Sequence, residues 1–409
     1  MTTVYGPVTD WATDFDHGDP EYNKNIHQIW ETLKASGCPI AHTERYGGTW
    51  LPLTHEMVHE IAYDTDHFTS RNVVVGQLKP SQVEDSMPAP IGGAPPITSD
   101  PPFHAGARRL LLPAFSPKKI DPLRSKMEKM CNDLIDKMGD REHVDAALEY
   151  SQHIPVLIIA EMLGLPLEDA DKFRGWVNLV LGNIGDERNE DRMAQFMEFD
   201  AYLHSHIADH VENPRDDLIS FLLDSEMDGQ KLLPEHVQGT VLLILIAGID
   251  TTWSGIGSSL WHLATNAVDR RRLVENPDMI PQAVEEFLRA YAPVTMARLV
   301  KEDVEFHGVQ MKEEDWVLLP FPAANRDEAQ FENAGTVDID REENRHAAFG
   351  LGIHRCIGSN LARLELNVAV ETFLKRFPDF ELNDSEEVTW STGQVRGPRT
   401  LPFRILARS

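Results

Sequence analysis

The sequence predicts a mainly α fold with small peripheral β-sheets. Apolar residues recur at helical spacing through most of the region 100–376. The longest helical segment, 234–266, is apolar on nearly all sides around 241–249, which is typical of a helix buried at the centre of a protein. The strand-like runs lie around this helical region, at 46–53, 300–309, 316–320 and after Phe377.

The helices are predicted from the spacing of their apolar residues, and the first of them is stopped by Gly37. In chain order, the expected helices are 21–36, 54–64, 102–115, 121–138, 146–163, 168–181, 191–211, 216–223, 234–266 and 361–373. Their number and the shortness of the strands give an α-rich body with sheets at its edges.

We expect one domain that spans residues 1–409. Its expected parts are a β-rich region at about 40–70, a helix-rich core at about 100–376 and terminal strands at about 377–409. The segment 70–100 is rich in proline and glycine, and loops of this length in compact domains usually serve binding. A disordered linker between two domains is the alternative. We favour substrate lids at 70–100 and 182–190, because the flanking segments read as parts of one body.

Composition and charge exclude several classes of protein. The formal net charge of −28 argues against nucleic acid as the main partner, because phosphate binding needs concentrated Lys and Arg. Three widely spread cysteines predict no disulfide framework. The N-terminus lacks the pattern of a signal peptide. The longest apolar run, 241–247, is far shorter than the roughly 20 residues of a membrane span. We therefore expect a soluble, cytoplasmic protein with no membrane contact.

One cysteine, Cys356, stands in a pattern that favours metal binding. Gly350 and Gly352 precede it, Gly358 follows it, and the helical pattern 361–373 comes next. This order places the sulfur near the unpaired N–H groups of a helix N-terminus, which favour the thiolate. Glycine turns let the backbone approach a flat ligand closely. A small core residue is the ordinary alternative for a free cysteine.

At these residues the chain resembles the cytochrome P450 family. FGLGIHRCIG matches the haem-binding signature of the family at Phe349, Gly350, Gly352, His354, Cys356 and Gly358. Further matches in the family's order are DPPFHAGAR (100–108), AGIDTT (247–252), EEFLR with Glu286 and Arg289, ANRDE (324–328) and DIDREENRHAAFG (338–350). The resemblance implies the cytochrome P450 fold, with the long central helix over haem b and Cys356 as the iron ligand.

The resemblance also implies roles for other residues. His104, Arg108, Arg298 and His354 match positions that bind the haem propionates, although each alone is more commonly a surface charge. The remaining expected haem contacts are Ala247, Phe349, Gly350 and Gly358. Glu286, Arg289 and Arg341 resemble the structural ion-pair triad of the family, which is scaffold rather than chemistry.

Asp250 and Thr251 are polar residues inside the otherwise apolar central helix. Burying each costs about 1–3 kcal/mol if it is unpaired. The resemblance implies an acid–alcohol pair that delivers protons to dioxygen, and the small residues Ala247 and Gly248 make room beside it. A threonine bonding back to the carbonyl of Ala247 is the structural alternative.

The activity implied is a monooxygenase that hydroxylates or O-dealkylates an organic substrate with one oxygen atom from O2. The chain has no dinucleotide-binding motif after a strand, so electrons from NAD(P)H should arrive through a separate ferredoxin and its reductase. A peroxide-driven enzyme and a non-catalytic haem sensor are the alternatives. Neither needs the acid–alcohol pair.

The substrate and the electron donor are expected at different sites. A small or medium hydrophobic molecule should contact the apolar pocket residues Val73, Val74, Ile97, Leu243, Val294 and Thr295. An acidic ferredoxin should dock near the locally basic residues Arg108, Arg109, Lys118, Lys119, Arg124 and Lys126. A solvated helix face is the plainer explanation for such a charge run.

HEMVH at 55–59 satisfies the H-E-x-x-H pattern of zinc proteases. Its helix is short and lies near the N-terminus, and no third ligand is evident downstream. We interpret it as a solvated helix face.

Overall fold

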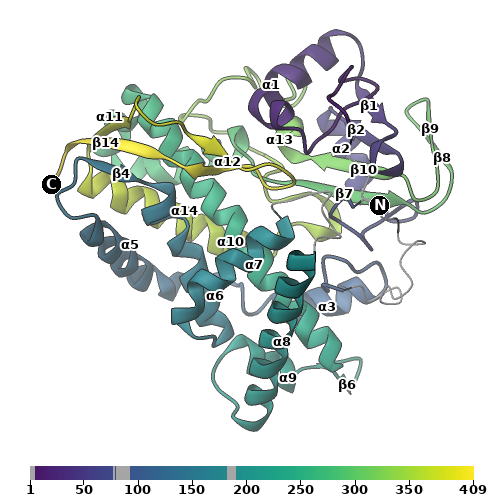
Figure 1. Ribbon diagram of the computed structural model, residues 1–409, viewed down its shortest axis with the longest axis horizontal. Coiled ribbons are helices and arrows are strands. Elements are labelled where there is room, and N and C mark those ends of the chain that lie inside the picture. The colour runs from purple at the N-terminus through teal and green to yellow at the C-terminus, as the bar shows by residue number, and fades with distance from the viewer. Residues whose placement is uncertain (1–4, 77–78, 80–92, 182–189) are drawn as a thin grey trace.

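Helix α10 (Pro234–Thr265) runs through the middle of the molecule (Figure 1). The computed structural model describes residues 5–76, 79, 93–181 and 190–409. α10 packs against α6 (His153–Leu163), α7 (Ala170–Leu181) and α14 (Ser359–Arg376). It is buried along most of its length because its residues are apolar or small on nearly every face.

The other helices surround this centre. They are α1 (Pro20–Ala35), α2 (His55–Tyr63), α3 (Phe103–Leu111), α4 (Pro117–Ile120), α5 (Arg124–Met138), α8 (Glu190–Glu212), α9 (Leu218–Asp224), α11 (Ala267–Glu275), α12 (Ile280–Ala290) and α13 (Phe321–Ala324). α5 packs along α14, whereas α8 and α9 lie together at the opposite end of the view from α1 (Figure 1).

The largest sheet has five strands in the order β1-β2-β10-β7-β3. They are β1 (Ile40–Thr43), β2 (Thr49–Pro52), β10 (Trp316–Pro320), β7 (Thr295–Val300) and β3 (Phe68–Thr69). β10 pairs antiparallel with β7, with Trp316 opposite Leu299 and Pro320 opposite Thr295. β10 is buried along its whole length, so this sheet has a core of its own, to which Trp30 of α1 contributes.

The remaining strands are short and peripheral. β11 (Asp379–Leu382), β14 (Pro402–Ala407) and β4 (His143–Asp145) form a three-stranded sheet in that order. The two-stranded pairs are β5 (Glu226–Met227) with β6 (Gln230–Lys231), β8 (Val304–Phe306) with β9 (Val309–Met311), and β12 (Thr389–Trp390) with β13 (Pro398–Thr400). The predicted mainly α fold with small peripheral sheets is therefore confirmed, while the assignment of one domain stays a prediction.

Several element boundaries differ from those predicted. The strand expected at 46–53 begins only at Thr49, because the backbone turns through positive φ at Tyr46, Gly47 and Gly48. The helix expected at 146–163 is preceded by a wide turn over Ala147–Ser151, and α6 starts at His153.

The strand expected at 300–309 is instead the end of β7 followed by the β8–β9 hairpin. The hairpin turns at His307 and Gly308, which both have positive φ. The expected lid at 182–190 and residues 77–78 and 80–92 of the other lie outside the described residues, apart from Glu190 at the start of α8.

α10 is the one helix in the described part of the chain that is long and apolar enough to cross a membrane. Of the most apolar 18-residue stretch of this helix, 67% is buried inside the protein, as expected for the core helix of a globular fold.

A fully buried ion pair connects α12 to the segment after α13. Arg289 and Glu286 are both 0% exposed, and Arg289 Nη2 lies 2.7 Å from Glu286 Oε1. Arg341 Nε lies 3.1 Å from Glu286 Oε2, which completes the expected triad geometrically. Arg289 also donates to the carbonyl oxygens of Asn325, Ala334 and Thr336. Every charge in this cluster therefore has a partner, as a buried charge requires.

Replacing Glu286 with Ala should lower the free energy of unfolding by about 3–5 kcal/mol, because Arg289 would keep a buried and unpaired charge. Urea denaturation followed by circular dichroism measures this change. Asp303→Asn is the matched control: it breaks the exposed pair with Lys312, and a cost under about 1 kcal/mol is expected. Equal costs for the two variants would contradict a structural role for the buried pair.

Candidate functional site

A large cavity lies between α10 and the loop that carries Cys356. Its volume is about 230 Å³, and part of it opens to solvent. It is therefore far larger than a site for a single water molecule, which needs about 10–15 Å³ by the same measure. Its walls come from α3, α10, α14, β7 and the loop 348–358.

The loop that carries Cys356 depends on two glycines. Gly350 has a φ of +73° and Gly352 a φ of +68°, a conformation that other residues rarely adopt. A Cβ atom on Gly352 would lie 2.1 Å from the carbonyl oxygen of Ala62, so α2 packs directly against this turn. The turn brings the chain back on itself, and the Cys356 N–H donates to the Phe349 carbonyl over 2.7 Å.

The Cys356 side chain opens onto the cavity just before the N-terminus of α14. Burial raises the pKa of its thiol, while the Gly358 N–H and the positive charges of Arg108, Arg355 and Arg363 lower it. These donors and charges stabilise a thiolate, and a bound metal cation would complete its deprotonation. The position therefore suits a thiolate ligand to a metal.

One end of the cavity gathers cationic and imidazole groups that lack a carboxylate partner. Arg108, Arg298 and His354 line the cavity, and the His104 ring packs edge-on against His354 with 4.4 Å between ring centroids. No Asp or Glu oxygen in the described ranges lies within 4 Å of these groups, as an ion pair would require. The Nε2 atoms of His104 and His354 are buried with no hydrogen-bond partner.

Burial acts on each of these four groups, and repulsion from neighbouring cations adds to it at Arg108, His104 and His354. Burial lowers the pKa of Arg298 to about 10 and that of Arg108 below its usual range. Burial and the charge of Arg108 lower the pKa of His104 to about 4, and burial and the charge of Arg298 depress that of His354 strongly. A ligand with two carboxylates would relieve both costs. The two propionates of a haem meet this requirement, so the residues present fit that cofactor.

Thr251 borders the cavity, whereas its neighbour Asp250 does not. Thr251 Oγ1 donates to the Ala247 carbonyl over 2.8 Å, the back-bond considered above as the structural alternative. Asp250 is 1% exposed and points the other way, with Oδ1 2.6 Å from Nη2 of Arg399 on β13. The contact is an ion pair but lacks the alignment of a hydrogen bond. The Arg399 guanidinium also lies over the Trp253 ring, 4.3 Å from its centroid.

Burial raises the pKa of Asp250, and the charge of Arg399 and its contact with the carboxylate oppose this. Gly248, on the same helical turn, makes room for Ile159 of α6, because a Cβ there would lie 2.5 Å from Ile159 Cδ1. The two small residues expected beside Asp250 and Thr251 therefore have different roles. Ala247 lines the cavity, whereas Gly248 lines it and also leaves room for α6 to pack.

Sequence reasoning missed two polar residues that line the cavity, Thr252 and Glu365. Burial raises the pKa of Glu365 to about 8, and the hydrogen bond with the Thr252 side chain opposes that rise. Glu365 is 1% exposed, so at neutral pH its carboxyl is held mostly in the protonated form. Its sequence signal was an acid among the apolar positions of α14 that face α10.

The expected pocket residues divide between two sides of a strand. Ile97, Leu243 and Val294 line the large cavity, but Val73, Val74 and Thr295 are not among its described lining residues. Thr295 lines a separate small cavity, because successive strand residues point to opposite faces and Val294 and Met296 face the large one. Val73 is instead held by its carbonyl, which accepts from the N–H of Ala297.

The H-E-x-x-H sequence lies on α2 as predicted, with the rings of His55 and His59 6.2 Å apart. Over the ranges that the structure covers, no group of three or more His, Cys, Asp or Glu side chains could hold a metal ion. The geometry therefore gives a zinc site no support.

Comparison with known proteins agrees with the geometry of this site. Residues 156–396 match the family described as Cytochrome P450. Cytochrome P450 CYP107DY1 of Priestia megaterium is 31% identical over 400 residues, 95% of this chain and 98% of that protein. Polyketide biosynthesis cytochrome P450 PksS of Bacillus subtilis is 35% identical over 76% of this chain and 77% of its own length.

Solved structures resemble the whole fold. CYP109E1 from Bacillus megaterium, crystallised with testosterone, has a TM-score of 0.85 and 28% identity over 95% of this chain and 99% of its own. PksS also has a TM-score of 0.85, with 31% identity over 96% of this chain and 100% of its own. The chain belongs to the cytochrome P450 family of haem-dependent monooxygenases.

Proposed function

We propose that this enzyme inserts one oxygen atom of O2 into a small or medium hydrophobic molecule, by hydroxylation or O-dealkylation. We further propose that its electrons come from NAD(P)H through a separate ferredoxin and ferredoxin reductase in the cytoplasm. The observation that carries the proposal is the placement of Cys356 and Thr251 on one cavity whose remaining walls are largely apolar.

The described residues would hold haem b at three kinds of contact. Cys356 would ligate the iron through its thiolate. The propionates would lie at His104, Arg108, Arg298 and His354, and the ring would lie against Ala247, Phe349, Gly350 and Gly358. When bound, the haem supplies the reductive activation of O2 and the transfer of one oxygen atom.

Thr251 and Asp250 would control protons at the cavity wall. The Thr251 hydroxyl hydrogen is engaged with the Ala247 carbonyl, so its oxygen presents lone pairs to the cavity until the hydroxyl turns. Asp250 would have to leave Arg399 to carry a proton toward Thr251. Arg399 therefore favours the charged form of Asp250 against the effect of burial, and it holds the carboxylate away from the cavity between proton transfers.

The apolar walls support a hydrophobic substrate. Ile97, Leu243 and Val294 offer no charge or hydrogen bond, so they would bind a substrate by burying its apolar surface. Relatives differ in their ligands: CYP109E1 was crystallised with testosterone and with corticosterone, and a mutant of EryK with erythromycin B. We favour a substrate of the size of an aromatic or terpenoid compound over one of the size of a macrolide. Low-to-high-spin shifts of the Soret band on ligand addition would rank the candidates.

The proposed ferredoxin surface is narrower than the sequence suggested. Arg108 faces the cavity, Arg124 pairs with Glu128 and Glu371, and Lys126 pairs with Glu161. Arg109, Lys118, Lys119 and Arg355 are exposed, as is Leu112 directly after α3, and no carboxylate in the described chain pairs with these four cations. Basic charge around an apolar side chain suits an acidic redox protein.

A complete reaction tests the proposal. The purified holoenzyme, supplied with NADPH and a surrogate ferredoxin and reductase, should consume O2 and form product only when substrate is present. Cys356→Ala should abolish both product and the strongly red-shifted Soret band of the reduced carbon monoxide complex. Product formed only with added hydrogen peroxide would favour the peroxide-driven alternative, and substrate binding without any product would favour a sensor.

Thr251→Ala should consume O2 but form much less product, because the cavity loses the hydroxyl that passes protons. General acid–base groups contribute about 10²–10⁴-fold, so we expect at least a 10-fold fall in product per O2 consumed. Thr251→Ser should restore most of the yield. Thr265→Ala is the matched control, since Thr265 makes the same backbone bond, to Trp261, at the far end of α10. An unchanged yield in Thr251→Ala would rule out this role.

Reversing Lys118 and Lys119 to Glu should slow reduction of the haem by the ferredoxin about 10-fold at low salt. The rate should also lose most of its salt dependence, because charge steering of the acidic partner is removed. Stopped-flow absorbance measures both effects. Lys312→Glu, on the connection between β9 and β10, serves as the control. The proposed docking surface would be wrong if the double variant and Lys312→Glu showed the same reduction rate and the same salt dependence.

A further inference from the structure

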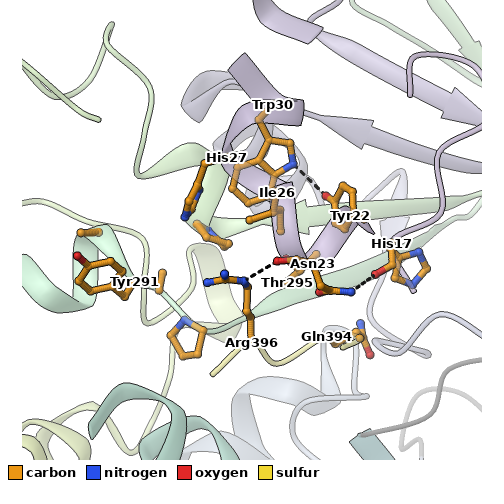
Figure 2. Close-up of a pocket in the computed structure, with 15 residues that line it drawn as sticks. His17, Tyr22, Asn23, Ile26, His27, Trp30, Tyr291, Thr295, Gln394 and Arg396 are labelled. Atoms are coloured by element: carbon orange, nitrogen blue, oxygen red, sulfur yellow. Dashed lines mark hydrogen bonds between the residues drawn. The ribbon is translucent and has the colours of Figure 1, made fainter. Parts of the chain in front are cut away.

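A small cavity lies on the other side of the strand wall from the large one (Figure 2). Its lining comes from α1, from residues 290–295 after α12, and from the turn 393–396. Its volume of about 20 Å³ suits one water molecule or one monatomic ion, since a water needs about 10–15 Å³. None of the residues that line this small cavity is among those proposed to hold the haem.

Arg396 brings a positive charge to this cavity without a negative partner. Its Nε donates to the Asn23 carbonyl over 3.2 Å, and its guanidinium lies 4.2 Å from the centroid of the Trp390 ring. Its two Nη atoms make no hydrogen bond, and no carboxylate lies within 4 Å, in the part of the chain that the structure describes. Figure 2 shows the guanidinium between α1 and Tyr291. Burial lowers the pKa of Arg396 to about 10, as expected for a charge without a counterion.

Two histidines add further unpartnered nitrogen atoms. His27 Nδ1 is buried without a hydrogen bond, and so are both ring nitrogens of His17, whose side chain is 3% exposed. Burial and the nearby charges of Arg326 and Arg396 hold the pKa of His27 well below its usual range. A neutral imidazole offers one N–H donor, and His27 lines the cavity, so its ring can donate toward it.

Tyr291 does not supply a donor to the cavity. The Asp269 carboxylate lies 2.9 Å from His262 Nε2, which must therefore carry the proton. His262 Nδ1 is then an acceptor, and it takes the Tyr291 hydroxyl hydrogen over 2.8 Å. Tyr291 is therefore occupied, whereas Arg396 and the histidines have N–H groups to donate into the cavity.

We propose that Arg396 and His27 bind one small monovalent anion, of the size of chloride, in this cavity. A water molecule could satisfy the same N–H groups but could not balance the charge of the half-buried Arg396, and even partial burial of a charge is costly without a counterion. The positive charge of Arg326, close enough to act on both Arg396 and His27, strengthens the preference for an anion.

The anion would stabilise a wall that both cavities share. The Arg396 N–H donates to the Pro293 carbonyl over 2.8 Å, and the Thr295 N–H donates to the Gln394 carbonyl over 2.9 Å. Pro293 lines both cavities, and Val294 lines the large one. Holding Arg396 in place therefore holds the turn 393–396 against this wall.

Crystals of the holoenzyme grown in bromide locate the anion directly. We expect an anomalous difference peak in the cavity, within about 3.5 Å of an Arg396 Nη atom and in contact with the His27 ring. A water molecule there, with bromide found only elsewhere or nowhere, would overturn the proposal. This outcome says nothing about the monooxygenase reaction, so the two proposals fail separately.

Thermal unfolding of the holoenzyme provides the test in solution. Replacing gluconate with chloride at constant ionic strength should raise the Tm by about 1–3 °C. Arg396→Gln should lose this difference, whereas Arg404→Gln, which removes an exposed arginine paired with Glu381, should keep it. An equal Tm in the two salts, or a chloride effect that survives in Arg396→Gln, would contradict the proposal. If Arg396→Gln does not fold, Arg396→Lys replaces it, because lysine keeps the charge but loses the planar fork.

Discussion

The buried ion pair between Glu286 and Arg289 supports the segment on which the site depends. The chain between α13 and α14 contains no helix longer than one turn and no strand, so its internal turns satisfy only some of its backbone groups. Arg289 supplies donors to carbonyls of this segment. Glu286 accepts from the Asp338 N–H and the Asn344 amide. The ion pair thus supplies this irregular segment with the hydrogen-bond partners that a neighbouring strand supplies in a sheet.

This support continues to the cysteine. Asn325, whose carbonyl accepts from Arg289, accepts through its side-chain oxygen from the Ala347 N–H over 2.6 Å. Ala347 in turn accepts from the Gly350 N–H, which starts the turn to Cys356. A loop that must hold a sulfur at one point in space thereby rests on an α-helix, α12, rather than on its own flexibility. Such support is what a preorganised metal ligand requires.

Much of this site could be predicted from the sequence, because its signals are local. The glycines before Cys356 and the polar pair in an apolar helix are visible as letters, and the mainly α fold follows from periodicity. Which way Asp250 points could not be predicted, since its partner Arg399 lies far away in sequence. Glu365 was missed for the same reason: its pKa depends on what surrounds it, and α14 alone does not show that. Predicting which cavity Thr295 faces required the register of its strand, because a shift of one residue moves every side chain to the opposite face of the sheet.

Charge is distributed around the two cavities in a consistent way. Arg298 and Arg396 lie on opposite sides of the wall that begins at Pro293, and neither has a carboxylate partner in the described chain. The chain carries 66 acidic residues against 38 basic ones, so unpaired arginines inside it cannot be ascribed to a shortage of acids. Placing them where a bound anion can compensate links the stability of each region to its ligand. In the large cavity that ligand is a dicarboxylate cofactor, and the same reasoning applied to the small cavity leads to an anion of atomic size.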